Sequence, residues 1–205
     1  ESDFYCLERE NFTPSQREYA IKRNFVRRIQ SKLAILVNEN LTKQIHFSVF
    51  STNAASINFF KKLSENKTDL CLILNGSPFE IDKDDRRYAL VRELTLKHNC
   101  AAAYVNLVGG QDDLVFDGDS IALNSSGKLI ARLKQFKADL LLIDVTNKDD
   151  LRVVGDHFLT KPNENWQAWN ALVTGLRDYV SKNGFSSVVL GLSGGIDSAV
   201  CATIA

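Results

Sequence analysis

Residues 69–108 of this protein, DLCLILNGSPFEIDKDDRRYALVRELTLKHNCAAAYVNLV, decide its fold. The apolar runs at 70–74 and 101–108 have the length of buried strands. Between them, residues 82–98 have the composition of a helix, with Asp82 available as a cap and further acidic residues in the first turn. A strand, a helix and a second strand in succession predict a layered α/β domain.

Further segments extend this unit in both directions. They are expected to be buried strands at 32–37 and 140–145, a hairpin of two strands at 120–133 and a helix at 54–65. A second unit begins at residue 166, where apolar residues recur at helical spacing, with Asn163 or Asn165 as the cap and Gly184 at the end. SSVVLGL (186–192) is then expected to be a strand, and AVCATIA opens another helix.

The chain therefore divides by pattern into three parts. We expect an α/β domain at 1–145, a linker without clear periodicity at 146–165 and the start of a second domain at 166–205. The chain begins without Met and stops inside an apolar helical pattern, so we expect it to be truncated at both ends.

Charge and cysteine content exclude several classes of protein. The 205 residues carry 25 basic and 25 acidic side chains, so there is no general attraction for nucleic acid or an anionic membrane, and any phosphate must be held locally. From the pattern of apolar residues we expect neither a membrane span nor a secretory signal. Its four cysteines include no CxxC pair, which argues against a zinc site. Cys71 and Cys100 are expected to be reduced core residues, and we expect the protein to be cytoplasmic.

One loop carries the strongest chemical signal. It is the string Gly191-Leu192-Ser193-Gly194-Gly195-Ile196-Asp197-Ser198, between an expected strand and an expected helix. Glycines let the backbone approach a ligand, and the free amides and dipole of a helix start attract anions. The two serines add hydroxyl donors, and the carboxylate of Asp197 suits a magnesium ion on phosphate oxygens. The alternative is a tight turn in which glycine and serine serve geometry only.

The same loop resembles the SGGIDS signature of the ATP pyrophosphatases, and the lysine of a Walker P-loop is absent. LRDYVSKNGFSSVVLGLSGGIDSA resembles the start of the synthetase domain of the glutamine-dependent NAD synthetase family. YVNLVGGQDDLVFDGDS (104–120) and LNGSPF (74–79) resemble the amidase domain of that family, which is of the nitrilase superfamily. The resemblance is strong from residue 69 to residue 205 and weak before it.

This resemblance implies a fold and an activity. The fold is a nitrilase-like α-β-β-α sandwich, represented by its C-terminal part. The first helix, strand and phosphate loop of an adenine-nucleotide α-hydrolase-like doubly wound domain follow. The activity is ATP-dependent amidation of nicotinate adenine dinucleotide to NAD, with Mg²⁺ as the metal and ammonia taken from glutamine. The implied partners are these small molecules and further copies of the chain, as a homo-oligomer. The loop at 191–198 would bind ATP, with Asp197 on the metal.

The amidase half departs from the family pattern. Such amidases use a Glu–Lys–Cys triad, and our alignment places Asn38 where the nucleophilic Cys belongs. An asparagine cannot form an acyl-enzyme, so we expect this amidase site to be inactive. Ser77 and Lys83 fall where the family contacts glutamine, although Lys83 also fits a solvated charge in an acidic first turn.

Two questions stay open at the level of sequence. Asp112, Asp113 and Asp117 could form a metal cluster, but their spacing fits turn and capping carboxylates better. The alternative function is a non-catalytic amidase-like scaffold that docks the synthetase domain and builds an oligomer. In either case we expect the 205-residue chain alone to be inactive, because it contains only the phosphate loop of the second domain.

Overall fold

The computed structural model describes residues 32–37, 47–51, 67–154 and 160–205, with backbone only for the first two ranges. Its elements are β1 (Lys32–Val37), β2 (Phe47–Ser51), β3 (Leu70–Asn75), α3 (Lys83–His98), β4 (Ala101–Asn106), β5 (Val108–Gln111), β6 (Leu114–Asp117), β7 (Ile121–Leu123), β8 (Leu129–Arg132), β9 (Leu140–Asn147), β10 (Asp150–Val153), α4 (Glu164–Lys182) and α5 (Ile196–Ile204). No helix among the described residues is long and apolar enough to cross a membrane.

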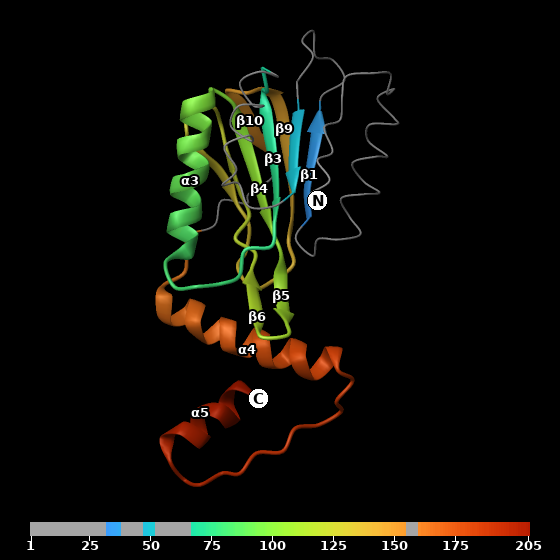
Figure 1. Ribbon diagram of the computed structural model, residues 1–205, viewed down its shortest axis with the longest axis vertical. Coiled ribbons are helices and arrows are strands. Elements are labelled where there is room, and N and C mark those ends of the chain that lie inside the picture. Colours follow the sequence, from blue (N-terminus) through green and yellow to red (C-terminus); the bar gives the residue numbers. More distant parts are fainter. Residues whose placement is uncertain (1–31, 38–46, 52–66, 155–159) are drawn as a thin grey trace.

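The strands form two packed sheets and a separate hairpin. One sheet has the order β2-β3-β4-β7-β8 and the other β1-β9-β10, while β5 and β6 pair with each other. Strands β2, β3 and β4 run parallel, and β7 and β8 add to them antiparallel. Helix α3 covers the outer face of the five-stranded sheet (Figure 1). The described part of the domain therefore has the layers helix, sheet and sheet.

Alternation along β3 and β4 explains these layers. Leu70 and Leu72 belong to a core cluster shared with β9 and β10, which lies between the two sheets. Their neighbours Cys71 and Ile73 belong to a second cluster with Val91 and other residues of α3. Because successive side chains of a strand point to opposite faces, a strand that is apolar at every position is buried on both.

The structure confirms the layered α/β fold and most of its expected elements. The strands expected at 32–37, 70–74 and 140–145 are present, as are the hairpin of β7 with β8 and the helix ending at His98. Asp82 does precede that helix, but it has a left-handed backbone, and its side chain makes no capping hydrogen bond. The helix expected at 54–65 lies outside the described residues.

Two expectations need correction. The segment expected as a linker contains β10, which pairs antiparallel with β9 and buries Leu151 in the core between the sheets. Residues 186–192 form no strand, and Val189 within them is 99% exposed. A strand needs a hydrogen-bonded neighbour, and no described strand pairs with this segment.

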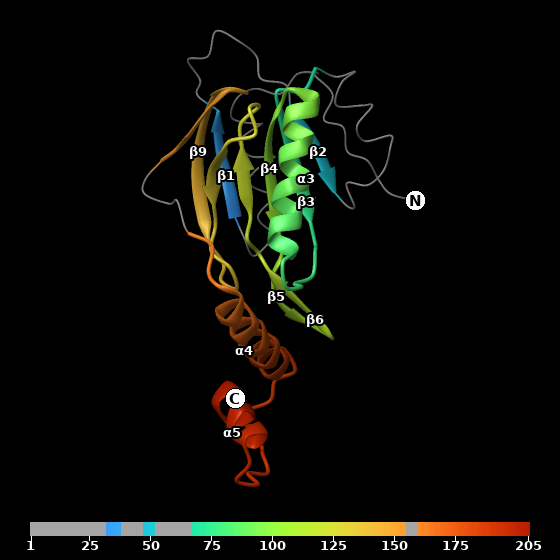
Figure 2. The same cartoon turned by 90° about the vertical axis from the view of Figure 1, so that its left-hand side faces the viewer.

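Helices α4 and α5 lie beyond one end of the sandwich (Figure 2). Asn163 caps α4 by accepting a hydrogen bond of 2.9 Å from the Trp166 amide, which decides between the two expected caps. Just beyond the helix, Gly184 has a φ of +73°, and its amide bonds to the carbonyl of Ser181 at 3.2 Å. This end matches the expected glycine stop.

Candidate functional site

The loop at 191–198 leads into helix α5, which begins at Ile196. Gly194 has a φ of +86°, a backbone conformation that residues with a Cβ rarely adopt. Gly195 occupies the N-cap position and has no side chain to accept from the first amides. The amides of the first turn have no carbonyl within the helix to bond to, so they are available to an anion.

Two serine hydroxyls close this loop. The Oγ atoms of Ser193 and Ser198 lie 3.1 Å apart, and Ser198 Oγ also donates to the carbonyl of Gly195 at 3.0 Å. Asp197 lies in the first turn of α5, next to Ser198 in the chain. The loop thus brings together backbone amides, hydroxyls and one carboxylate, all of them close to the solvent.

The turn after β3 is held by a buried asparagine. Asn106, at the end of β4, accepts from the Ser77 amide at 2.8 Å and donates to the Ser77 carbonyl at 3.0 Å. Burial raises the pKa of the nearby Tyr104 phenol, although Arg87 and the hydrogen-bonding side chains of Ser77 and Asn75 act in the opposite direction. Both backbone polar groups of Ser77 are therefore fixed by one side chain.

Lys83 stands at the start of α3, six positions after Ser77. Its Nζ lies 2.5 Å from a carboxylate oxygen of Glu80, and its side chain is 22% exposed. Arg86 binds the other oxygen of Glu80 at 2.9 Å, and the hydrogen bonds from both lysine and arginine lower the pKa of that carboxyl. Lys83 is thus paired locally in the described structure.

A buried ion pair lies behind this turn, and sequence reasoning missed it. The guanidinium of Arg87 binds both carboxylate oxygens of Asp117, at 2.8 and 3.0 Å, with both side chains almost fully buried. Burial alone would lower the pKa of Arg87, but the hydrogen bonds and charge of Asp117 outweigh it and raise this pKa. Asp117 is therefore neither a turn residue nor a metal ligand, whereas Asp112 does lie in the hairpin turn, with a φ of +50°.

The position of Arg87 along α3 is the sequence signal that could have revealed this buried ion pair. Asp84 and Arg87 continue the buried stripe of α3 that Val91 and Leu94 form at helical spacing. A charged side chain in such a stripe needs a partner inside the protein. One carboxylate oxygen of Asp84 lies 3.1 Å from Lys161 Nζ, and the other accepts a hydrogen bond of 3.2 Å from Gln167 Nε2 of α4.

Helix α4 is fastened to the β5–β6 hairpin. The amide of Gly110 donates to Asp178 Oδ2 at 2.8 Å, and Lys182 Nζ donates to the carbonyl of the same glycine. A Cβ on Gly110 would stand 3.2 Å from the Gly175 backbone, so the two elements touch through their glycines. The first helix of the second unit therefore packs directly on the β5–β6 hairpin.

The expected site residues fall into separate places. Ser77 lies in the turn between β3 and α3, and Lys83 is the first residue of α3. The loop at 191–198 lies on the far side of α4 from that turn (Figure 1). Asn38 lies outside the described residues. Among the described residues, no group of three His, Cys, Asp or Glu side chains could hold a metal ion. Cys71 and Cys100 are free and buried, and burial raises the pKa of Cys71 and brings that of Cys100 to about 11.

Comparison with known proteins supports one family along the chain. Residues 168–205 match the NAD synthase family model. The glutamine-dependent NAD(+) synthetase of Acinetobacter baylyi is 41% identical over 73% of this chain and 28% of its own length. The enzyme of that name from Synechocystis is 34% identical over 99% of this chain and 35% of its own length.

Solved structures agree with the sequence comparison. The structure of glutamine-dependent NAD+ synthetase from Acinetobacter baumannii, in complex with ADP, is 38% identical and has a TM-score of 0.70. It covers 78% of this chain, which covers 31% of it. The corresponding synthetase from Cytophaga hutchinsonii has 25% identity and a TM-score of 0.57, over 77% of this chain and 24% of its own. In sequence and in fold, the chain is therefore similar to the glutamine-dependent NAD(+) synthetases, and it spans about a third of their length.

Proposed function

We propose that the chain is part of a NAD(+) synthetase, a ligase that uses ATP to convert nicotinate adenine dinucleotide to NAD. The observation that carries this proposal is the loop at 191–198, which opens α5 inside the segment that matches the NAD synthase family. The names of the relatives support the enzyme over a scaffold without catalysis. The buried free thiols fit a reducing compartment, and we place the protein in the cytoplasm.

The donor set of the loop fits the phosphates of ATP. Gly191, Leu192, Ser193, Gly194, Gly195, Ile196, Asp197 and Ser198 would surround them. The free amides at the start of α5 and the two hydroxyls donate hydrogen bonds to phosphate oxygens. The carboxylate of Asp197 offers the oxygen ligand that Mg²⁺ prefers, with the remaining ligands supplied by phosphates and water. Magnesium would neutralise charge on the phosphates as pyrophosphate leaves.

The amidase-like half is proposed to provide structure without releasing ammonia. Ser77 and Lys83 would contact glutamine in an active relative, and Asn106 holds the Ser77 turn in a fixed conformation. With an asparagine at position 38 there is no thiolate to attack the amide of glutamine. The ammonia for the synthetase would then come from solution.

The loop assignment is tested in the full-length protein by measuring AMP and pyrophosphate release from ATP with nicotinate adenine dinucleotide, Mg²⁺ and ammonium. Gly194→Ala should reduce the rate roughly a hundredfold, because the new Cβ strains the loop where phosphate approaches. Gly184→Ala is the matched control, since Gly184 also has a positive φ and open space around it but lies outside the loop.

Two results would contradict the assignment. One is an unchanged rate in Gly194→Ala, which would place the phosphates elsewhere. The other is an equal loss in Gly184→Ala, which would attribute the effect to backbone strain alone.

A further inference from the structure

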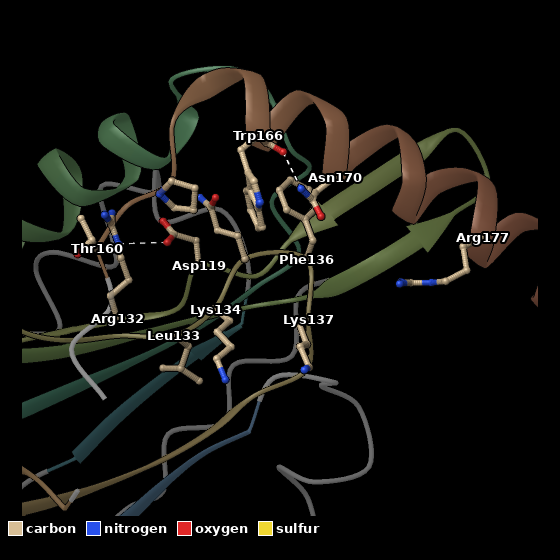
Figure 3. Close-up of a pocket in the computed structure, with 12 residues that line it drawn as sticks. Asp119, Arg132, Leu133, Lys134, Phe136, Lys137, Thr160, Trp166, Asn170 and Arg177 are labelled. Carbon is tan, nitrogen blue, oxygen red and sulfur yellow. Dashed lines mark hydrogen bonds and ion pairs between the residues drawn. The ribbon is translucent and has the colours of Figure 1, made fainter. Parts of the chain in front are cut away.

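A cavity of about 510 Å³ lies between α4 and the segment that joins β8 to β9 (Figure 3). Small-molecule sites in proteins have volumes of about 300 to 1,000 Å³. Its lining consists of Asp119, residues 132–137, Thr160 and Pro162 ahead of α4, and Trp166, Asn170 and Arg177 of α4 itself. None of these residues belongs to the Ser77 turn or to the loop at 191–198. Neither the proposed ATP site nor the proposed glutamine contacts use it.

The charges around this cavity are mostly positive. Arg132, Lys134, Lys137 and Arg177 line it, and the one carboxylate among its described lining residues is Asp119. That carboxylate is already paired with Arg132, at 3.1 Å. Figure 3 shows Arg177 extending from α4, and its guanidinium also pairs with the neighbouring Asp178 at 3.0 Å. The lining therefore favours a ligand with negative charge.

Aromatic rings form the wall next to these cations. The rings of Phe136 and Trp166 have centroids 6.1 Å apart and are tilted by 55°. Phe136 is buried and also packs edge-on against Phe79, so it offers Trp166 a fixed surface to pack on. Trp166 is 42% exposed, which leaves an indole surface on which a planar ring can stack.

One buried acceptor of the lining lacks a hydrogen bond. Gln135 is 5% exposed, and within the described structure its Oε1 has no hydrogen-bond partner. The Nε of Arg132 is also buried but lies 3.1 Å from Asp119 Oδ1, so its charge is already paired. A ligand with a hydrogen-bond donor that reaches Gln135 Oε1 would satisfy that atom.

We propose that this cavity is a binding site for a small aromatic anion, a planar ring that carries a carboxylate or a phosphate. The ring stacks on Trp166 beside Phe136, and the anionic group lies among Lys134, Lys137 and Arg177. This site goes beyond the proposed synthetase activity and does not depend on it.

Phenyl phosphate and benzoate are the probes, and isothermal titration calorimetry on the full-length protein measures their binding. At least one of them should bind, and the probe that binds better identifies the anionic group. Lys134→Gln/Lys137→Gln should weaken binding about tenfold, which corresponds to about 1.4 kcal/mol. Lys67→Gln/Lys128→Gln is the control, because it removes the same charge from exposed positions away from the cavity and should leave binding unchanged.

Partial ligands and a loop variant make the test specific. Phenol, which lacks the charge, and inorganic phosphate, which lacks the ring, should each bind at least several-fold more weakly than phenyl phosphate. The proposal is overturned if neither probe binds, if inorganic phosphate binds as tightly as phenyl phosphate, or if both double variants have the same effect. It is also overturned if Gly194→Ala abolishes binding and the cavity variant does not, because the ligand then occupies the phosphate loop. Probe binding and the release of AMP and pyrophosphate are separate measurements, so the two proposals can fail independently.

Discussion

Arg87 and Asp117 show how single residues hold the turn beside the proposed glutamine contacts. The pair joins α3 to the end of β6, and Asn106 approaches the same carboxylate at 3.4 Å. Asn106 in turn holds both backbone groups of Ser77. A substitution in this buried ion pair is therefore expected to disturb the Ser77 turn as well as to lower the stability of the fold.

The first prediction concerns that ion pair. Arg87→Ala leaves the Asp117 carboxylate buried without its partner and should lower the free energy of unfolding by about 3 to 5 kcal/mol. The matched change is Arg86→Ala, one position away, which removes an exposed pair with Glu80 and should cost less than about 1 kcal/mol. Urea denaturation measures both. Similar losses in the two variants would contradict the buried role of Arg87.

The second prediction concerns pH. Burial raises the pKa of Asp119 from 3.8 to about 7, against the attraction of Arg132, and the neighbouring charge of Asp117 adds to the rise. The folded state therefore holds this proton more tightly than the unfolded chain. The resulting stabilisation is complete below about pH 4 and is lost as the pH rises to about 7.

Asp119→Asn should remove this part of the pH dependence. Between pH 4 and pH 8, the free energy of unfolding of the unchanged protein should fall by about 2 to 4 kcal/mol more than that of the variant. Asp113→Asn, at an exposed position, is the control and should follow the unchanged protein. Parallel curves for Asp119→Asn and the unchanged protein would show that Asp119 titrates alike in the folded and unfolded states.

At the scale of elements, the contact between α4 and the β5–β6 hairpin joins the two units. Asp178 and Lys182 both bind the backbone of Gly110, and Gly175 allows the close approach. Helix α4 buries Gln167, Ala171, Thr174 and Asp178 at spacings of three and four residues, so one face of it rests on the domain. The two backbones lie close together at this contact, so few larger residues can replace its glycines.

The third prediction tests this contact. Gly110→Val places side-chain atoms where the Asp178 Cβ and the Gly175 backbone already lie 3.2 Å from a new Cβ. Amide hydrogen exchange across Glu164–Lys182 should become about tenfold faster or more, while exchange across α3 should stay unchanged. Gly191→Ala is the control, because nothing lies within 4 Å of its added Cβ. Unchanged protection of α4 in Gly110→Val would mean that other contacts hold the helix.

The fourth prediction distinguishes the two asparagines at the start of α4. Asn163→Ala removes the hydrogen bond to the Trp166 amide and should cost about 1 kcal/mol of stability. Asn165→Ala lies inside the first turn and should have little effect or stabilise the helix slightly. Thermal unfolding of the two variants gives the comparison, and a larger loss for Asn165→Ala would contradict the observed cap.

For the whole molecule, the sequence predicts the core better than its connections. A continuous apolar run such as 70–74 is typical of a strand buried on both faces, so β3 and helix α3 follow from pattern. The pattern did not predict β2 or the β5–β6 hairpin, and the run expected as one strand at 101–108 divides into β4 and the start of β5. The SGGIDS loop and its helix also follow, because glycines and serines at a helix start have a local physical meaning.

The missed features depend on strand pairing and side-chain packing. Leu151 of β10 enters the core only because β9 lies beside it, and Asp117 is paired only because α3 turns Arg87 towards it. The apolar string at 186–192 has strand composition, yet it pairs with no described strand and stays exposed. Local pattern fixes propensity, whereas pairing and burial are set by tertiary contacts.

The most direct test of the proposed synthetase measures NAD formation by the full-length protein from nicotinate adenine dinucleotide, ATP and Mg²⁺, once with ammonium and once with glutamine. We predict NAD with ammonium and none with glutamine, since Asn38 cannot replace a nucleophilic cysteine. NAD formed from glutamine would keep the synthetase and refute the inactive amidase. No NAD from either nitrogen source would contradict the central claim.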